Sequence, residues 1–202
     1  PGDNLNNPSS HYSNIWSHWK SFFLDVIAIG NHHGSYETEV EYFDLPGQYY
    51  SKTEGEDIRF IVLNSDNENT APEQAAWLEE ELKASTETFV FLIFHHSPYT
   101  LTTVHNWWER KRFHQAVRPL IWKYRHKITA LFNGHDHIAS LVLLNDLPQI
   151  ISGAVFEPRK PEPIHETDPT GVTVNTVWLG AWEPHWTRLD IDAVKNHMWI
   201  NF

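Results

Sequence analysis

The apolar residues of this chain fall into short runs that alternate with polar segments. Three of these runs are largely apolar, have the length of a strand and end directly at a histidine-containing cluster: residues 26–29, 89–94 and 128–132. Runs of this kind are typical of strands that are buried on both faces of a sheet. Open α/β sheets bind their ligands at the carboxyl ends of the strands, so the pattern predicts that the three clusters lie at one edge.

Segments with helical spacing separate these runs. Apolar residues recur at helical intervals over residues 12–23, 70–82 and about 109–124. The second segment begins with Thr70 and has Pro72 in its first turn, which is typical of a helix N-terminus. We therefore expect helices on the flanks of the sheet.

Shorter β-like runs account for much of the remaining chain. Residues 49–50 and 58–63 are expected to pair across the polar turn at residues 52–57. The final third contains strand-length runs between proline-containing turns, which we expect to form a second sheet: residues 141–144, 149–152, 174–179, 186–191 and 198–202. The chain is therefore expected to be a single domain over residues 1–202, of α/β (α+β) class, in which two mixed sheets form a β sandwich flanked by helices.

The composition narrows the possible partners. There are 15 Lys and Arg against 26 Asp and Glu, a formal charge of −11, which disfavours nucleic-acid and membrane-surface binding. No apolar run approaches the length needed to cross a bilayer. The chain has no cysteine, so a bound metal has to be held by His, Asp, Asn or Glu.

Several of these residue types stand beside glycine or at a predicted strand end, where a side chain can point into a cleft. The candidates are Asp3, Asn31, His96, His135 and His137. Such a mixture of oxygen and nitrogen ligands suits Fe, Mn or Zn. The i, i+2 spacing of His135 and His137 is easily formed in a loop, and a carboxylate such as Asp3 can bridge two cations.

The order of these motifs matches a known family. Gly2-Asp3, Gly30-Asn31-His32, His96-Ser97-Pro98 and Gly134-His135-Asp136-His137 occur in the order found in calcineurin-like metallophosphoesterases. The chain resembles this superfamily from residue 2 to about residue 153. Within it, the sequences around residues 49–50, 60–65, 74–82 and 95–99 are similar to the purple acid phosphatase branch.

The resemblance implies a metallophosphoesterase-type β sandwich with two metal ions, Fe, Mn or Zn, and a hydroxide between them that attacks phosphorus. In the family's pattern, Asp3 would bridge the ions, Asn31, His96 and His135 would complete the second metal site, and His137 would bind the first ion. His32 would be the acid that protonates the leaving oxygen.

The chain departs from the family pattern at two places. The Asp-x-His motif that supplies the first metal site from the first strand is absent, so only His137 and Asp3 remain for that ion. We therefore expect the chain to be N-terminally truncated, with the second ion bound firmly and the first weakly or not at all. His33 stands where the family commonly has an acidic residue.

Other histidines and aromatic residues are expected to have structural roles. His95 precedes a predicted ligand and is expected to point to the opposite side of its strand. The residues that follow could line a substrate cleft, although core packing is the more frequent use of such residues: His105, Trp107, Trp108, Arg110 and His114.

The leading functional hypothesis is metal-dependent hydrolysis of a small phosphorylated substrate, a phosphomonoester. One alternative is a phosphodiesterase that acts on cyclic nucleotides or other small diesters. Another is a non-catalytic fragment or binding domain with an incomplete metal centre. The resemblance to secreted acid phosphatases favours a secreted or periplasmic location.

Overall fold

The computed structural model describes residues 26–32, 34–100, 102, 105, 107–152, 165–167, 172–180 and 187–201. Only the backbone is described at residues 107–108 and 165–167. The helix expected over residues 12–23, together with Asp3 and His33, lies outside the described residues.

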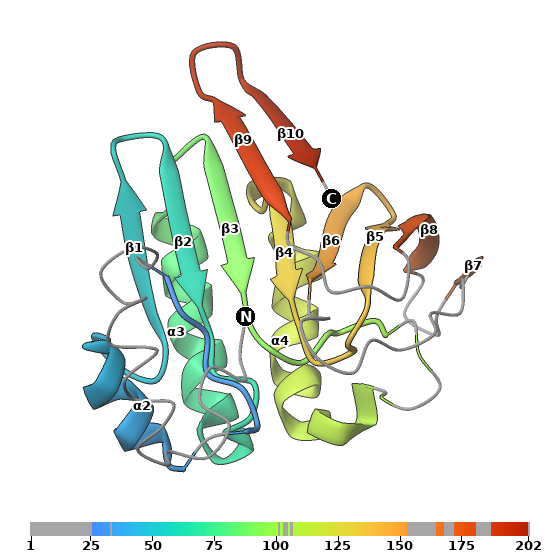
Figure 1. Cartoon of the computed structure of the whole chain (residues 1–202). Helices are drawn as coiled ribbons and strands as arrows, with labels where there is room; N and C mark the ends of the chain where they lie inside the picture. Colours follow the sequence, from blue (N-terminus) through green and yellow to red (C-terminus); the bar gives the residue numbers. More distant parts are fainter. Residues whose placement is uncertain are drawn as a thin grey trace.

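One large mixed sheet organises the chain (Figure 1). Its strand order is β1-β2-β3-β4-β6-β5-β8-β7. The strands are β1 (Tyr50–Glu54), β2 (Ile58–Val62), β3 (Phe89–Ile93), β4 (Ala130–Asn133), β5 (Ala139–Leu144), β6 (Leu147–Ser152), β7 (His165–Thr167) and β8 (Thr173–Leu179). The central strands β2, β3, β4 and β6 are parallel, and all other neighbours are antiparallel. The carboxyl ends of β2, β3 and β4 therefore meet at one edge.

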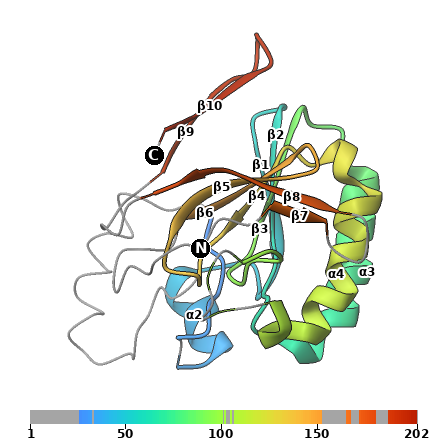
Figure 2. The ribbon, with the colours of Figure 1, turned by 90° about the vertical axis from the view of Figure 1, so that its right-hand side faces the viewer.

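Helices cover one face of this sheet. Helices α3 (Ala71–Ala84) and α4 (Lys111–Lys123) lie side by side on it (Figure 2), and α2 (Tyr36–Phe43) lies near the edge where β2 and β3 end (Figure 1). Short 3-10 turns η1 (Glu68–Thr70), η2 (Trp107–Arg110) and η3 (Arg125–Lys127) flank the two long helices. None of the helices in the described part of the chain is long and apolar enough to cross a membrane.

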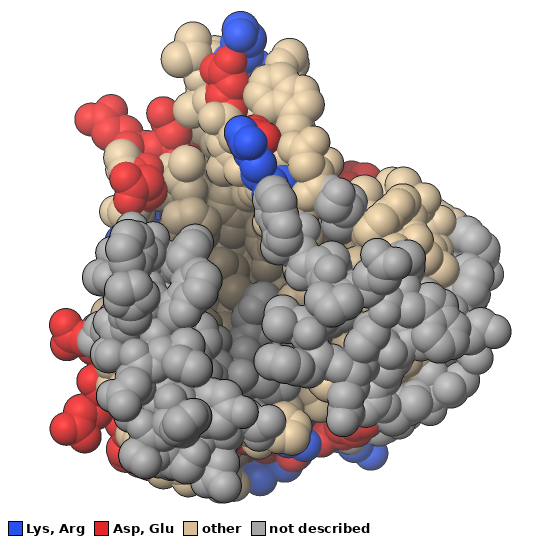
Figure 3. Space-filling model, in the orientation of Figure 1, with Lys and Arg blue, Asp and Glu red and all other residues tan. Residues whose placement is uncertain are grey.

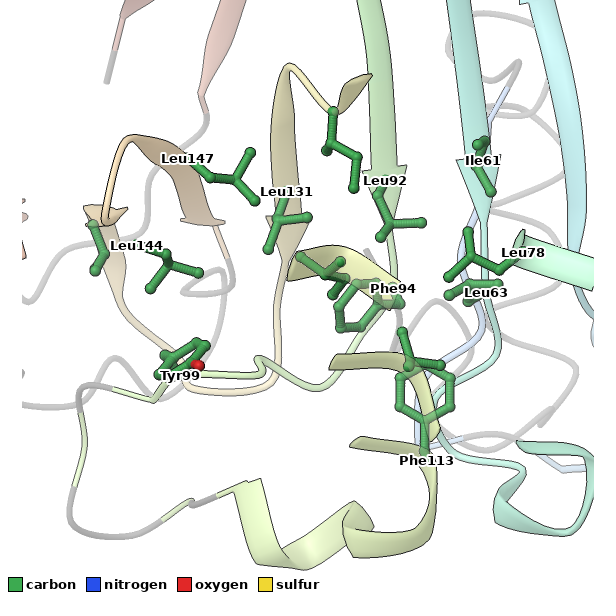
Figure 4. Packing of buried hydrophobic residues seen from close by; sticks show 14 of the residues in the cluster. Ile61, Leu63, Leu78, Leu92, Phe94, Tyr99, Phe113, Leu131, Leu144 and Leu147 are labelled. Carbon is green, nitrogen blue, oxygen red and sulfur yellow. The ribbon is translucent and has the colours of Figure 1, made fainter. Parts of the chain in front are cut away.

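The main core lies between the helices and the sheet (Figure 4). Phe94, just beyond the end of β3, and Phe113 of α4 are fully buried, with ring centroids 5.5 Å apart. Burying an aromatic side chain contributes about 2–3 kcal/mol. This contact fixes α4 against the same loop that carries the histidines after β3.

A β-hairpin lies on the other face of the sheet. Strands β9 (Arg188–Asp192) and β10 (His197–Asn201) pair antiparallel and lie opposite the helices (Figure 2). Apolar residues of the hairpin, among them Leu189, Ile191 and Ile200, pack against a buried cluster on this face of the sheet, which consists of Phe89, Phe91, Ala130 and Ile150. The result is three layers: helices, sheet and hairpin.

The expected fold class is confirmed, with a large mixed sheet, a second small sheet and flanking helices. The strands expected in the final third are present, but β5, β6 and β8 extend the large sheet instead of forming the second one. Strand β6 pairs with β4, β5 pairs with β6, and β8 pairs with β5, so these strands continue the same sheet. The expectation of one domain over residues 1–202 stays a prediction.

Residues 26–29 were expected to be a strand, and this expectation was wrong. Ile27, Ala28 and Ile29 are buried, but the segment pairs with no strand in the described part of the chain. The Tyr50 hydroxyl takes the place of a partner strand: it accepts a hydrogen bond from the Ile27 N–H at 2.7 Å and donates to the Ile27 carbonyl at 2.9 Å. A side chain therefore satisfies the backbone groups that a neighbouring strand would otherwise pair.

Candidate metal centre

The loops after β3 and β4 carry the histidines of the site, and backbone hydrogen bonds just beyond the end of β3 tie the two chain segments together. The Phe94 N–H donates to the Phe132 carbonyl at 3.1 Å, and the Gly134 N–H donates to the His95 carbonyl at 2.9 Å. These bonds hold His95 and His135 on neighbouring chain segments, with ring centroids 5.0 Å apart. Both side chains are buried.

The turn after β4 has an unusual backbone. His135 and His137 have φ angles of 62° and 56°, in the left-handed region that side chains other than glycine rarely adopt. Asp136 between them is fully buried, and its N–H donates to the Gly134 carbonyl at 2.7 Å. Left-handed conformations of this kind cost on the order of 1 kcal/mol each and cluster at functional sites.

Three ligand atoms converge at this edge of the sheet. Oδ1 of Asn31 lies 2.8 Å from Nε2 of His95 and 3.1 Å from Nδ1 of His135, and the two histidine nitrogens are 3.2 Å apart. Each atom comes from a different chain segment. Their spacing is that of neighbouring ligands of one cation.

His96 lies beside this triad of Asn31, His95 and His135. Its ring centroid is 4.2 Å from that of His135, and Ser65, in the loop after β2, lies 2.8 Å from its Nδ1. Its Nε2 is buried and has no hydrogen-bond partner among the described residues. Burial, together with the neighbouring His95 and His135, holds the pKa of His96 well below its usual value.

A second group lies on the other side of the His135 ring. Oε2 of Glu109 is 2.8 Å from Nε2 of His135, and both oxygens of Glu109 are 3.2 Å from Nδ1 of His105. Burial opposes ionisation of Glu109, but the two histidines outweigh it and lower the pKa of the carboxyl. Burial and the neighbouring His95 lower the pKa of His135, despite the opposing effect of Glu109.

The triad and His96 fit a metal ion. Metal binding requires unprotonated imidazole, and the lowered pKa values keep His96 and His135 in that form at neutral pH. Ligand atoms of His95, His96 and His135 all lie within 4.8 Å of one another. A carboxamide oxygen with several imidazoles suits Zn, Mn or Fe.

The structure places the predicted site residues as follows. Asn31, His96 and His135 lie together. His137 is half-buried, and among the described residues it joins neither group of converging ligand atoms; its ring centroid is 6.3 Å from that of His105. His32 is exposed beside Asn31. The roles of these residues as ligands and acid stay predictions, as does the role of Asp3.

His95 lies in the site, contrary to the expectation that it points away. The alternation of side chains in a strand does not reach it, because β3 ends at Ile93. Ser65 and Glu109 were also missed. The position of Ser65 two residues after the apolar run at residues 58–63 was a usable signal, whereas nothing in the sequence near Glu109 links it to His135.

A buried cluster of histidines beside an asparagine, at the carboxyl edge of a mixed α/β sheet, is an arrangement that could hold a metal ion. The sequence matches the calcineurin-like phosphoesterase family over residues 2–139, more than half of the chain. The chain belongs to this family.

One of two similar solved structures supports the fold. The protein titled "GAP50 the anchor in the inner membrane complex of Plasmodium" superposes with a TM-score of 0.51 at 11% identity, covering 75% of this chain and 53% of that one. PhoD gives a TM-score of 0.40 at 14% identity, covering 76% and 36%. The chain thus spans about half of the first structure and less of the second. A search of curated protein sequences found no match.

Proposed function

We propose that this chain forms part of a metal-dependent phosphoesterase that hydrolyses small phosphate monoesters. The family is one of phosphoesterases. The observation that carries the proposal is the convergence of Asn31 Oδ1, His95 Nε2 and His135 Nδ1, at 2.8–3.2 Å, beside the buried Nε2 of His96, which has no hydrogen-bond partner in the described part of the chain.

These residues would hold the ion through uncharged atoms. The ion therefore keeps most of its positive charge for a phosphate group, and when bound it supplies a Lewis acid for the phosphoryl oxygens and an activated water. His137 and Asp3 are the proposed ligands for the other ion, with Asp3 shared between the two ions as in the family's pattern.

His32 is the proposed acid for the leaving oxygen. Its neighbour in the chain, Asn31, is at the centre of the triad, and the exposure of His32 lets it meet a substrate that approaches from solvent. The proton would pass from the imidazolium of His32 to the ester oxygen as the phosphorus–oxygen bond breaks.

The charge of the chain favours a small substrate. On the face shown in Figure 3, Asp and Glu gather at the upper left, over the turn between β1 and β2, where Glu54, Glu56 and Asp57 are exposed. Lys and Arg are few and scattered on the described part of this face. A long nucleic acid needs a basic surface, which the formal charge of −11 does not favour.

The proposal is tested by assaying a monoester and a diester side by side. The whole natural protein that contains this chain is loaded separately with Zn²⁺, Mn²⁺ or Fe²⁺ and given p-nitrophenyl phosphate or bis-p-nitrophenyl phosphate. We expect the monoester to be hydrolysed at least about tenfold faster. Asn31→Ala should abolish the activity, whereas Asn201→Ala, at an exposed position of β10, should retain it.

Three results would contradict the proposal in different ways. Faster hydrolysis of the diester would make the protein a phosphodiesterase. Equal activity of Asn31→Ala and wild type would show that the metal site lies elsewhere. Metal binding without hydrolysis of either ester would favour a non-catalytic binding domain.

A further inference from the structure

Glu109 contacts the nitrogen of His135 that faces away from the triad. Its Oε2 lies 2.8 Å from Nε2 of His135. On the opposite side of the same ring, Nδ1 lies 3.1 Å from Oδ1 of Asn31 and 3.2 Å from Nε2 of His95. One nitrogen of the ring therefore faces a carboxylate, and the other faces the candidate metal centre.

The carboxylate decides where the ring carries its proton. An ionised carboxylate only accepts hydrogen bonds, so a neutral imidazole at 2.8 Å has to donate from Nε2. Nδ1 then presents a lone pair toward Asn31 and His95. The opposite tautomer would turn a lone pair toward the carboxylate, which is repulsive.

Glu109 is held in place from a neighbouring loop. The residue after it, Arg110, donates from Nε to Oδ1 of Asp66 at 2.9 Å, and the backbone N–H of Arg112 donates to Oε1 of Glu68 at 2.7 Å. Asp66 and Glu68 follow β2 in the chain, close after Ser65, the residue that contacts His96. The segment that carries Glu109 and the loop that holds His96 thus form one connected support.

We propose that Glu109 is a positioning residue, which fixes the tautomer and ring orientation of His135 so that Nδ1 is available to a metal ion. The inference rests on the metal-binding part of the function proposed above. A carboxylate that accepts a hydrogen bond from a metal-binding histidine orients the ring and increases its basicity. Glu109 lies outside all four sequence motifs of the site.

The competing role for Glu109 is that of a ligand. His105, Glu109 and His135 form a second group of ligand atoms within 4.8 Å of one another. An ion held there would need the Nε2 lone pair of His135. Both nitrogens of one ring would then have to be unprotonated if the triad were also occupied, so the hydrogen bond is the simpler arrangement.

Two measurements on the 202-residue chain test the proposal: the dissociation constant and stoichiometry for Zn²⁺ by calorimetry, and the ¹⁵N shifts of the His135 ring in the metal-free state. We expect Glu109→Ala to weaken Zn²⁺ binding by about 10- to 100-fold with the stoichiometry unchanged. The ¹⁵N shifts should move from one tautomer to a mixture of two. Glu109→Gln, which keeps an acceptor oxygen, should recover part of both effects.

Glu80→Gln is the matched control, because Glu80 is an exposed carboxylate of α3; it should change neither measurement. The proposal is overturned if Glu109→Ala binds Zn²⁺ within about threefold of wild type, or if it loses one whole ion per chain, which would make Glu109 a ligand. If wild type binds no Zn²⁺, the proposed metal centre is refuted. The ¹⁵N shifts of the metal-free chain then still decide whether Glu109 sets the tautomer.

Discussion

Ser65 contacts Nδ1 of His96, whereas Nε2 of the same ring is buried and has no hydrogen-bond partner among the described residues. Its hydroxyl lies 2.8 Å from Nδ1 and accepts a hydrogen bond from the His96 backbone N–H at 3.0 Å. A hydroxyl oxygen has two lone pairs, so it can also accept the Nδ1 proton and leave Nε2 unprotonated. Glu109 accepts a hydrogen bond from His135 in the same way, but there the donor is Nε2, and Nδ1 is left unprotonated.

Replacing Ser65 should affect both stability and metal binding. Ser65→Ala leaves two buried donors of His96 without this acceptor, which should lower the free energy of unfolding by about 1–3 kcal/mol. It should also weaken Zn²⁺ binding by about tenfold, because the tautomer of His96 is no longer fixed. Urea unfolding and calorimetry measure the two effects.

Ser85→Ala is the control for this prediction. The hydroxyl of Ser85 donates to the Glu81 carbonyl at 2.8 Å at the end of α3, away from the triad. Ser85→Ala should lower stability without changing the affinity for Zn²⁺. Equal Zn²⁺ affinities of the two variants would show that Ser65 has only a structural role.

His95 should be needed for metal binding. His95→Ala removes one of the three atoms of the triad, and we expect the chain to lose its bound ion, as measured by elemental analysis after dialysis. His96→Ala should weaken binding by about tenfold or more. His126→Ala, at an exposed position in η3, should leave the metal content unchanged. Full metal content in His95→Ala would exclude the triad as the site.

His114 should make the protein less stable in acid. It is fully buried, and neither ring nitrogen has a hydrogen-bond partner among the described residues. Burial, with the nearby Arg118 and Arg110, lowers its pKa to about 3 in the folded chain. Between about pH 6.5 and pH 3 only the unfolded chain binds this proton, so stability falls with falling pH by about 1.4 kcal/mol per unit.

The measurement for His114 is the difference between two pH profiles. The free energies of unfolding of wild type and His114→Leu are compared at pH 7, 5.5 and 4.5, and the variant should lose less stability as the pH falls. His126→Leu, at an exposed site, serves as the control and should follow wild type. Parallel profiles for wild type and His114→Leu would contradict the prediction.

Gly180 should tolerate no side chain. A Cβ at this position would lie 2.6 Å from the end of the Trp178 ring and 2.7 Å from the Cβ of Ala139, the first residue of β5. Gly180→Ala should therefore destabilise the chain by about 1–3 kcal/mol. At Gly47 the nearest atom would be 3.5 Å away, so Gly47→Ala should be close to neutral. Thermal unfolding of both variants compares the two sites. Equal melting temperatures would show that a Cβ at Gly180 does not clash with Trp178 and Ala139.

Much of the fold was predictable from short-range pattern. The buried strands β3 and β4, the β1–β2 hairpin and helices α3 and α4 follow from apolar periodicity and turn chemistry. Helix α2 was missed because it has only eight residues, of which two are buried. Its start at Ser35, whose hydroxyl accepts from the Thr38 N–H at 3.1 Å, is a cap signal.

The candidate site, like the fold, was predictable from the sequence only in part. The sequence by itself determined that Asn31, His96 and His135 follow buried apolar segments, and the parallel strands β3 and β4 bring His96 and His135 to one edge. It could not assign His95, because the residue at which β3 ends decides whether strand alternation applies. Nor could it find Glu109, since only the packing of α4 against the sheet brings a helix start 26 residues away in sequence within 2.8 Å of His135. Periodicity is a local property of the chain, whereas the partner of a ring nitrogen is set by contacts between distant segments.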